Sequence, residues 1–344
     1  MKSKTIYIIT LNGYFNFGNR LQNYALTRYL SLLNYNVYTY WEKNIIDKIK
    51  ISIKLLSPIK EHKRFKKIFL YSKKYIKESS KINKANFVVI GSDQVWNPID
   101  AKNNSVLLGA TVETVKISYA ASFGVKEIPY ELVNYYKENL SKIDYLSLRE
   151  ENGKQIIEKL LGKVDSQVLI DPTMLIDCKE WEKICIQPKN IKKIKCDRYI
   201  LVYFLGKLSN SRKKEIERVA YENKCKIINI LDQKSPFYVS GPSEFLWLEK
   251  NAYLICTDSF HSSVFALLFN RPFVIFNREE EGMENMGSRI ETLLNKFKIE
   301  NRRYNGLNIT KENIEHNYTE AYKILEEERK KSDAFLRKAL DFKE

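Results

Sequence analysis

Short apolar runs alternate with longer amphipathic stretches along most of the chain. Runs rich in Ile, Val and Tyr predict strands, and they cover residues 5–10, 36–41, 87–92, 115–120, 145–149, 198–206, 226–231, 252–257 and 272–276. Stretches with helical periodicity predict helices, and they cover residues 19–33, 150–161, 211–224, 242–250 and 259–270. Because strands that alternate with crossover helices form parallel sheets covered on both faces, the pattern predicts an α/β fold of the doubly wound, Rossmann-like type.

The length and the punctuation of the chain predict two domains. Its 344 residues exceed the usual size of a single core, and Pro172, Pro188 and a lysine-rich polar run interrupt the alternation. We therefore expect an N-terminal α/β domain over residues 1–177 and a C-terminal α/β domain over residues 178–317. Residues 318–344 follow a helical pattern, and we expect this helix to pack back onto the N-terminal domain. Two facing sheets of this kind place a ligand between the carboxyl ends of their strands.

Composition narrows the class of protein. The chain is 44% hydrophobic and 12% aromatic, which is typical of a globular protein rather than a disordered one. The first apolar run is interrupted by Asn12 and Gly13 and is too short for a secretory signal, and no stretch approaches the roughly 20 apolar residues of a membrane span. A cytoplasmic location is expected. The five cysteines form no CxxC pair, so neither a metal site nor a disulfide framework is predicted.

Positive charge is concentrated in one segment. The formal net charge is +16, and residues 43–84 hold 14 Lys and Arg against Asp47, Glu61 and Glu78, which is +11. Isoleucine, leucine and aromatic residues are interleaved with these lysines, a mixture that suits helices lying on an anionic membrane surface. A solvated lysine-rich face and a nucleic-acid surface are the alternatives, but no nucleic acid is expected as a partner because no known binding signature accompanies the segment.

The first strand-to-helix turn reads LNGYFNFGNRLQNYAL. Glycine at this position lets backbone amides approach a ligand at a helix N-terminus, but neither a dinucleotide fingerprint nor a P-loop is present. Asn16, Asn19 and Gln22 offer hydrogen bonds to a neutral polyol and are candidate acceptor-binding residues. A tight turn without a ligand is the alternative.

A second candidate turn, FVVIGSDQVWNP, ends an apolar strand with Asp93 and Trp96. A carboxylate beside an indole is a common way to hold a sugar, because the carboxylate accepts hydroxyl protons while the indole covers the apolar face of the ring. The alternative is that Asp93 caps a helix and Trp96 packs in the core.

A third candidate, Arg149, ends the strand in YLSLREENG. A guanidinium at a strand end can bind a carboxylate or a phosphate in bidentate fashion. A surface ion pair with Glu150 or Glu151 is the alternative.

The stretch TDSFHSS, residues 257–263, lies between two apolar runs. Ser259 and His261 are expected in the first turn of a helix, where the positive helix end favours a bound anion. An imidazole there can exchange a proton or hold a phosphate oxygen. A half-buried, hydrogen-bonded histidine without a ligand is the alternative.

Taken together, these motifs resemble a known family. GNRLQNYAL, VVIGSDQVWNP, SLREENG, LIDPTMLI and TDSFHSSVFALLFNRPFVIF followed by GSRIETLL are similar, in this order over about residues 5–297, to the motifs of the polysaccharide pyruvyl transferase family. The resemblance implies two facing α/β domains of the GT-B type. It also implies transfer of the enolpyruvyl unit of phosphoenolpyruvate to sugar hydroxyls, commonly as a cyclic pyruvate ketal on a polysaccharide precursor.

The resemblance also implies roles for single residues. Arg149 and His261 match the donor-site positions, with Ser259 beside them and Arg278 or Arg289 as a further anion ligand. His261 is then the general acid or a phosphate ligand, and Asp93 the base for the acceptor. No cofactor and no metal are expected besides phosphoenolpyruvate as co-substrate.

The implied acceptor is a lipid-linked saccharide on the N-terminal, acceptor side, and the donor lies on the C-terminal side. Segment 43–84 would then hold the enzyme peripherally at the inner face of the membrane. A nucleotide-sugar glycosyltransferase of the same shape and a non-enzymatic polyanion-binding protein are the competing hypotheses.

Overall fold

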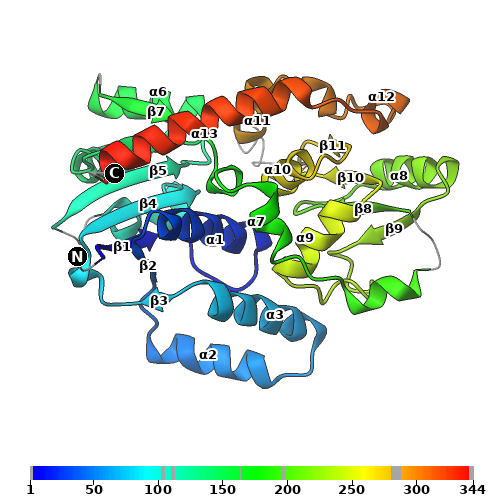
Figure 1. Ribbon diagram of the computed structural model, residues 1–344, viewed down its shortest axis with the longest axis horizontal. Coiled ribbons are helices and arrows are strands. Elements are labelled where there is room, and N and C mark those ends of the chain that lie inside the picture. The colour runs from blue at the N-terminus through cyan, green and yellow to red at the C-terminus, as the bar shows by residue number, and fades with distance from the viewer. Residues whose placement is uncertain are drawn as a thin grey trace. The chain divides into compact units, whose positions relative to one another are not determined.

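The computed structural model describes residues 3–101, 105–109, 113–162, 164–194, 198–279 and 288–340. The chain divides into two compact units (Figure 1). Unit 1 contains residues 1–50, 72–176 and 325–344, and unit 2 contains residues 51–71 and 177–324. The segment 51–71, which the sequence analysis assigned to the N-terminal domain, thus groups with unit 2.

The described residues of unit 1 form a seven-stranded sheet in the order β3-β2-β1-β4-β5-β6-β7. All neighbouring strands are parallel. The strands are β1 (Thr5–Ile9), β2 (Asn36–Tyr40), β3 (Glu78–Ser79), β4 (Phe87–Asp93), β5 (Val115–Ala121), β6 (Leu146–Leu148) and β7 (Ser166–Val168). The order reverses between β1 and β4, and such a switch point opens a crevice at the carboxyl ends of the strands.

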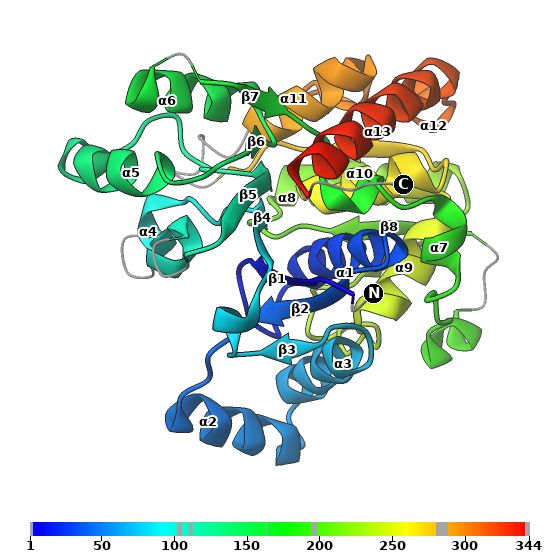
Figure 2. The ribbon, with the colours of Figure 1, turned by 60° about the vertical axis from the view of Figure 1, so that its left-hand side comes forward.

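Helices cover both faces of this sheet. Figure 2 shows α4, α5 and α6 on one face and α1 with the last part of α13 on the other. The helices of unit 1 are α1 (Phe17–Leu32), α4 (Pro98–Ala101), α5 (Val133–Leu140) and α6 (Glu151–Leu161), with short 3-10 helices at Ile82–Lys84, Ser105–Leu108, Tyr130–Leu132 and Pro172–Met174. The apolar side of α6 packs on the sheet through Ile156, Ile157 and Leu160, as its helical spacing requires.

Unit 2 contains a second parallel sheet, in the order β11-β10-β8-β9. Alternate residues of its strands face opposite ways: Ile200 and Val202 pack against α8, whereas Tyr203 packs against Phe245 of α9. The strands are β8 (Tyr199–Tyr203), β9 (Lys226–Asn229), β10 (Leu254–Thr257) and β11 (Phe273–Ile275). The helices are α7 (Cys178–Glu182), α8 (Asn210–Glu222), α9 (Pro242–Asn251), α10 (Phe260–Leu268), α11 (Ser288–Phe297) and α12 (Lys311–Ile314), with 3-10 helices at Lys189–Lys193 and Glu300–Arg302.

Three of the four points where the chain passes from one unit to the other lie within helices. These helices are α2 (Ile45–Leu56), α3 (Lys60–Tyr75) and α13 (Thr319–Ala339). The part of α13 from Leu325 onward belongs to unit 1, where Arg329 donates hydrogen bonds to the carbonyl oxygens of Met174 and Ile176. Residues 341–344 of the predicted C-terminal helix lie outside the described residues.

None of the helices in the described ranges combines the length and the hydrophobicity needed to span a bilayer.

Candidate active site

The switch point of unit 1 brings polar side chains together at the carboxyl ends of β1 and β4. Thr10, which follows β1, donates a hydrogen bond from Oγ1 to the carbonyl oxygen of Ser92 (3.0 Å). Asp93, the last residue of β4, has a φ of +76°. This left-handed conformation is rare for a residue with a side chain, and such strain concentrates at functional sites. Five other described non-glycine residues also have a positive φ, so the backbone marks Asp93 as strained without by itself identifying it as functional.

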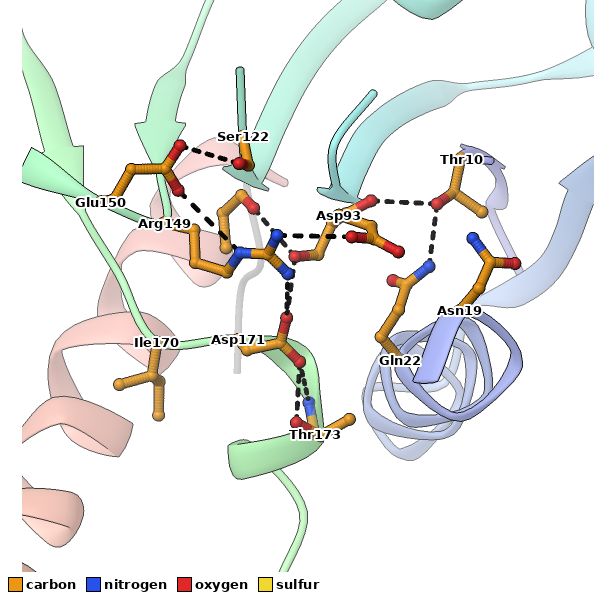
Figure 3. A network of polar contacts seen from close by, with 12 residues as sticks. Thr10, Asn19, Gln22, Asp93, Ser122, Arg149, Glu150, Ile170, Asp171 and Thr173 are labelled. Atoms are coloured by element: carbon orange, nitrogen blue, oxygen red, sulfur yellow. Dashed lines mark hydrogen bonds and ion pairs between the residues drawn. The ribbon is translucent and has the colours of Figure 1, made fainter. Parts of the chain in front are cut away.

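Arg149 lies at the centre of a buried polar network (Figure 3). It follows β6 and is 3% exposed. Its Nη1 donates to Asp171 Oδ2 (2.8 Å) and its Nη2 to Asp93 Oδ1 (3.3 Å). The network extends further, because Asp171 Oδ1 accepts from the backbone nitrogen and the hydroxyl of Thr173 (3.0 and 2.7 Å).

A third carboxylate completes the surroundings of Arg149. Glu150 Oε2 lies 4.0 Å from Arg149 Nε, while Glu150 Oε1 accepts a hydrogen bond from Ser122 (2.7 Å). Burial by itself lowers the pKa of the Arg149 guanidinium, but Asp93, Asp171 and Glu150 together raise the pKa above its usual value. The guanidinium therefore stays charged.

This arrangement changes the interpretation of Arg149. The alternative of a solvated surface ion pair is wrong, because the side chain is buried. One positive charge faces three carboxylates, so an anionic donor meets Arg149 only in competition with Asp93, Asp171 and Glu150. Direct donor binding by Arg149 stays a prediction, and the observed contacts hold Asp93 in place.

The polar residues of the first turn have structural partners. Asn16 caps α1, and its side chain accepts a hydrogen bond from the Asn19 backbone nitrogen (3.3 Å). The Asn19 side-chain oxygen accepts from Arg20 Nε and Nη2 (3.0 and 2.7 Å). Acceptor binding by Asn16 and Asn19 stays a prediction.

Two predicted acceptor contacts are wrong, because their side chains are fully buried. Gln22 is 0% exposed and donates a hydrogen bond to Thr10 Oγ1 (2.8 Å). Trp96 is also 0% exposed, packs against Phe123, and donates from Nε1 to the Leu107 carbonyl oxygen (3.1 Å). An indole without an exposed face offers no platform to a sugar, so Trp96 is a core residue.

A cavity of about 630 Å³ opens at the carboxyl ends of β1 and β2. It is lined by both segments that follow these strands and by residues near α4: Ile9, Thr10, Leu11, Asn12, Tyr40, Trp41, Glu42, Lys43, Asn44, Asp100, Val106 and Leu107. Asn12 donates to the Tyr40 carbonyl oxygen (3.0 Å), while its own side-chain oxygen has no hydrogen-bond partner within the described part of the chain. Partial burial, followed by the negative charge of Asp93, raises the pKa of Asp100 above its usual value.

Trp41 is the aromatic residue that the sequence analysis missed. It is half-buried and packs against Tyr14, with ring centroids 5.0 Å apart. Lys43 Nζ lies 4.0 Å from the Trp41 ring centroid and pairs with Glu78 Oε2 (2.5 Å). The tryptophan that ends the run at 36–41 was visible in the sequence, but only the order of strands in the sheet shows that it borders the switch point.

The switch point of unit 2 lies between β8 and β10. Asp258, directly after β10, accepts hydrogen bonds from the backbone nitrogens of Leu205 (2.7 Å) and Gly206 (2.8 Å). Arg278, after β11, places Nε 3.4 Å from Asp258 Oδ2. A Cβ at Gly206 would lie 3.0 Å from that same oxygen, so glycine permits the close approach. The carboxylate thus joins the ends of three neighbouring strands.

His261 is in the first turn of α10, as predicted, and is 8% exposed. Ser259 occupies the N-cap position directly after Asp258. Ser259, His261 and Arg278 therefore lie at the same edge of one sheet, where the N-terminus of α10 adds a positive dipole end. The positive helix end and the imidazole suit an anionic ligand, which would meet Arg278 in competition with Asp258.

A buried carboxyl group of α9 contacts α10. Ser262 donates a hydrogen bond to Glu249 Oε1 of α9 (2.5 Å), and both residues are fully buried. Burial raises the pKa of Glu249 well above its usual value, and the hydrogen bond from Ser262 opposes only part of that effect. We therefore expect Glu249 to be protonated and neutral in the folded protein.

Arg289, the other candidate for an anion ligand, is a buried residue of α11. Within the described ranges, no group of three or more His, Cys, Asp or Glu side chains is arranged to hold a metal ion.

Comparison with known proteins decides the family. Residues 16–280 match the family model described as polysaccharide pyruvyl transferase. The chain belongs to the polysaccharide pyruvyl transferase family. The match covers more than half of the chain and confirms the resemblance drawn from the motifs. Family membership implies a transferase that acts on polysaccharide. No curated protein sequence matches this chain significantly.

Solved structures of other proteins resemble the fold of this chain. The S. aureus MnaA–UDP complex is 10% identical, with 99% of this chain and 98% of that chain covered and a TM-score of 0.51. The UDP-N-acetylglucosamine 2-epimerase from Rickettsia bellii is 11% identical, with 99% and 97% covered and a TM-score of 0.46. At such low identity the likeness to MnaA concerns the fold alone. It confirms the predicted α/β class with two doubly wound units of the GT-B type.

Proposed function

We propose that this chain transfers the enolpyruvyl unit of phosphoenolpyruvate to hydroxyls of a lipid-linked polysaccharide precursor, forming a pyruvate ketal and releasing phosphate. The observation that carries the proposal is that the family-matched region sets Ser259, His261 and Arg278 at the carboxyl edge of the unit 2 sheet. Phosphoenolpyruvate carries a carboxylate and a phosphate on one vinyl carbon, so its site needs cations and helix-end amides.

The chemistry follows from the donor. A proton added to the methylene carbon turns it into a methyl group and leaves an oxocarbenium-like centre, which a sugar hydroxyl attacks. Phosphate then leaves, and a second hydroxyl closes the ketal. Of the two hydroxyl protons released, one balances the proton used at carbon and the other leaves with phosphate.

The side chains have distinct roles in this proposal. His261 supplies the proton to carbon or holds the phosphate, Arg278 neutralises the donor's charge, and Asp93 accepts a hydroxyl proton. Asp93 suits that role because the Arg149 contact orients its carboxylate.

The cavity of unit 1 suits the acceptor rather than the donor. Its charged lining residues are Glu42, Asp100 and Lys43, and Lys43 is already paired with Glu78. Two carboxylates and one paired lysine give the lining no net positive charge, and such a lining is unfavourable to a polyanion. Trp41 and Asn12 instead offer an aromatic surface and a hydrogen-bond acceptor, which suit a sugar with free hydroxyls.

The test is a transfer assay with phosphoenolpyruvate and bacterial lipid-linked saccharides. We expect phosphate release together with a carboxyethylidene mass increment on the saccharide. His261→Ala is expected to reduce turnover by roughly 100-fold or more, as loss of a general acid does, whereas Trp41→Ala is expected to raise KM for the saccharide at unchanged KM for the donor. Transfer of a hexose from a nucleotide sugar, with no response to phosphoenolpyruvate, would favour the glycosyltransferase alternative.

A further inference from the structure

Helix α2 exposes an apolar surface unlike that of any other long helix in the described residues. None of its residues is buried, although seven of its twelve positions are Ile or Leu. Five of these side chains are more than half exposed: Ile45 (75%), Ile46 (60%), Ile49 (53%), Ile53 (60%) and Leu56 (87%). Such a contiguous apolar surface marks an interaction site.

The five side chains form one face of the helix. At about 100° per residue, they fall within an arc of roughly 100°. Ile51 and Leu55, which are half-buried, fall on the opposite side. One side of α2 therefore rests on the protein, and the other faces outward.

The neighbouring helix does not share this property. Figures 1 and 2 both show α2 beside α3, but of the Ile, Leu and Phe side chains of α3 only Leu70 is exposed (54%), whereas Ile68 is fully buried and Phe65 and Phe69 are half-buried. Within unit 2, Arg64 donates to the carbonyl oxygens of Ile230 and Tyr238 (3.1 and 3.3 Å), and Lys67 pairs with Glu244 (2.6 Å). Segment 43–84 thus divides into an anchoring helix and an outward-facing one.

We propose that α2 is an interfacial helix that inserts its outward apolar face into the surface of an anionic lipid bilayer. Lys48 lies on one flank of the apolar arc and Lys50 on the other, by the same helical geometry. This is the pattern of a helix lying in a membrane surface, with its apolar side in the acyl boundary and its lysines at the headgroups.

The charge on these flanks favours a bilayer over a second copy of the chain. A two-fold contact between two α2 faces would bring the lysine flanks of both copies together, and like charges at an interface are unfavourable. An anionic surface instead attracts each lysine. Such docking would hold the proposed enzyme beside a lipid-linked acceptor, a purpose that rests on the proposed function, whereas the binding itself does not.

Binding of the full-length protein to lipid vesicles tests the proposal without any substrate. We expect binding to phosphatidylglycerol-containing vesicles and much weaker binding to phosphatidylcholine vesicles. Ile49→Ser combined with Ile53→Ser is expected to weaken the binding by about tenfold or more, because two inserted side chains are lost. The matched control is Ile186→Ser with Leu307→Ser, two exposed apolar residues outside α2, which should leave the affinity unchanged.

A second variant reports insertion directly. Ile49→Trp is expected to shift its fluorescence emission to shorter wavelength when anionic vesicles are added, because the indole enters an apolar medium. Equal vesicle binding by the wild type and the Ile49→Ser, Ile53→Ser variant would overturn the proposal. So would a concentration-dependent dimer in sedimentation that the same variant abolishes, in the absence of vesicle binding.

Discussion

At the scale of single residues, the buried network around Arg149 sets the strongest expectation. Replacing Arg149 by Ala leaves Asp93, Asp171 and Glu150 close together without their common cation. We expect the free energy of unfolding to fall by about 3–5 kcal/mol, the usual cost of stranding buried charges. Urea unfolding measures this. Lys142→Ala, which removes an exposed partner of Glu138, is the control and should cost less than about 1 kcal/mol.

A loss below about 1 kcal/mol for Arg149→Ala would show that these carboxylates do not depend on the guanidinium.

Glu249 gives a prediction about pH. Its pKa in the folded state is raised by burial, so folding takes up a proton whenever the unfolded carboxyl is ionised. The contribution is fully present below the unfolded pKa of about 4.3 and is lost as the pH rises towards the folded pKa. Glu249 should therefore contribute a loss of stability as the pH rises above about 4.3, and Glu249→Gln should remove that contribution. Denaturant titrations at several pH values measure both slopes, and parallel slopes would contradict a protonated Glu249.

The sequence identified most site positions but not their surroundings. Arg149 and His261 were visible because polar residues stood out at the ends of apolar runs. Burial was not visible, since Trp96 and Trp41 are both tryptophans near strand ends and only one faces a cavity. The partners of Arg149 include Asp93 and Asp171, which are far apart in the sequence. Only the order of strands in the sheet brings them together.

At the scale of elements, Gly91 determines how closely β4 and β5 pair. Its φ is +121°, and a Cβ there would lie 2.4 Å from the Tyr119 carbonyl oxygen. Gly91→Ala is therefore expected to destabilise the protein by about 1–3 kcal/mol and to disturb the adjacent Asp93. Thermal unfolding measures the loss. Gly162→Ala is the control for the cost of the positive φ alone, because a Cβ at Gly162 would have no neighbour within 4 Å. An equal loss of stability in both variants would show that the contact with Tyr119 adds nothing to that cost.

Strands that lie within an apolar run were predictable, whether long or short. β4 and β8 read as continuous apolar runs because both faces of a parallel strand are buried, and the three-residue strands β6 and β11 lie within the runs 145–149 and 272–276. β3 and β7 have two and three residues and lie within no such run. The segment now seen as α2 and α3 was recognised by composition, but which of its apolar residues face outward depends on packing.

At the scale of the whole molecule, we propose that the two sheets bind different ligands. Unit 2 presents Arg278 and His261 at its switch point, and unit 1 presents a cavity bordered by Trp41, Glu42 and Asp100. The charges of these sites, rather than the shared fold, argue for an anionic donor and a neutral, hydroxyl-rich acceptor.

The central claim is that the carbon skeleton of phosphoenolpyruvate becomes part of the saccharide. The most direct measurement follows phosphoenolpyruvate labelled with a heavy carbon isotope at its methylene position, using NMR of the glycan product. The account predicts a labelled methyl signal of a ketal on the saccharide, carrying one deuterium when the reaction runs in heavy water, and its loss in His261→Ala. A saccharide that stays unlabelled while phosphoenolpyruvate is recovered intact would contradict the account.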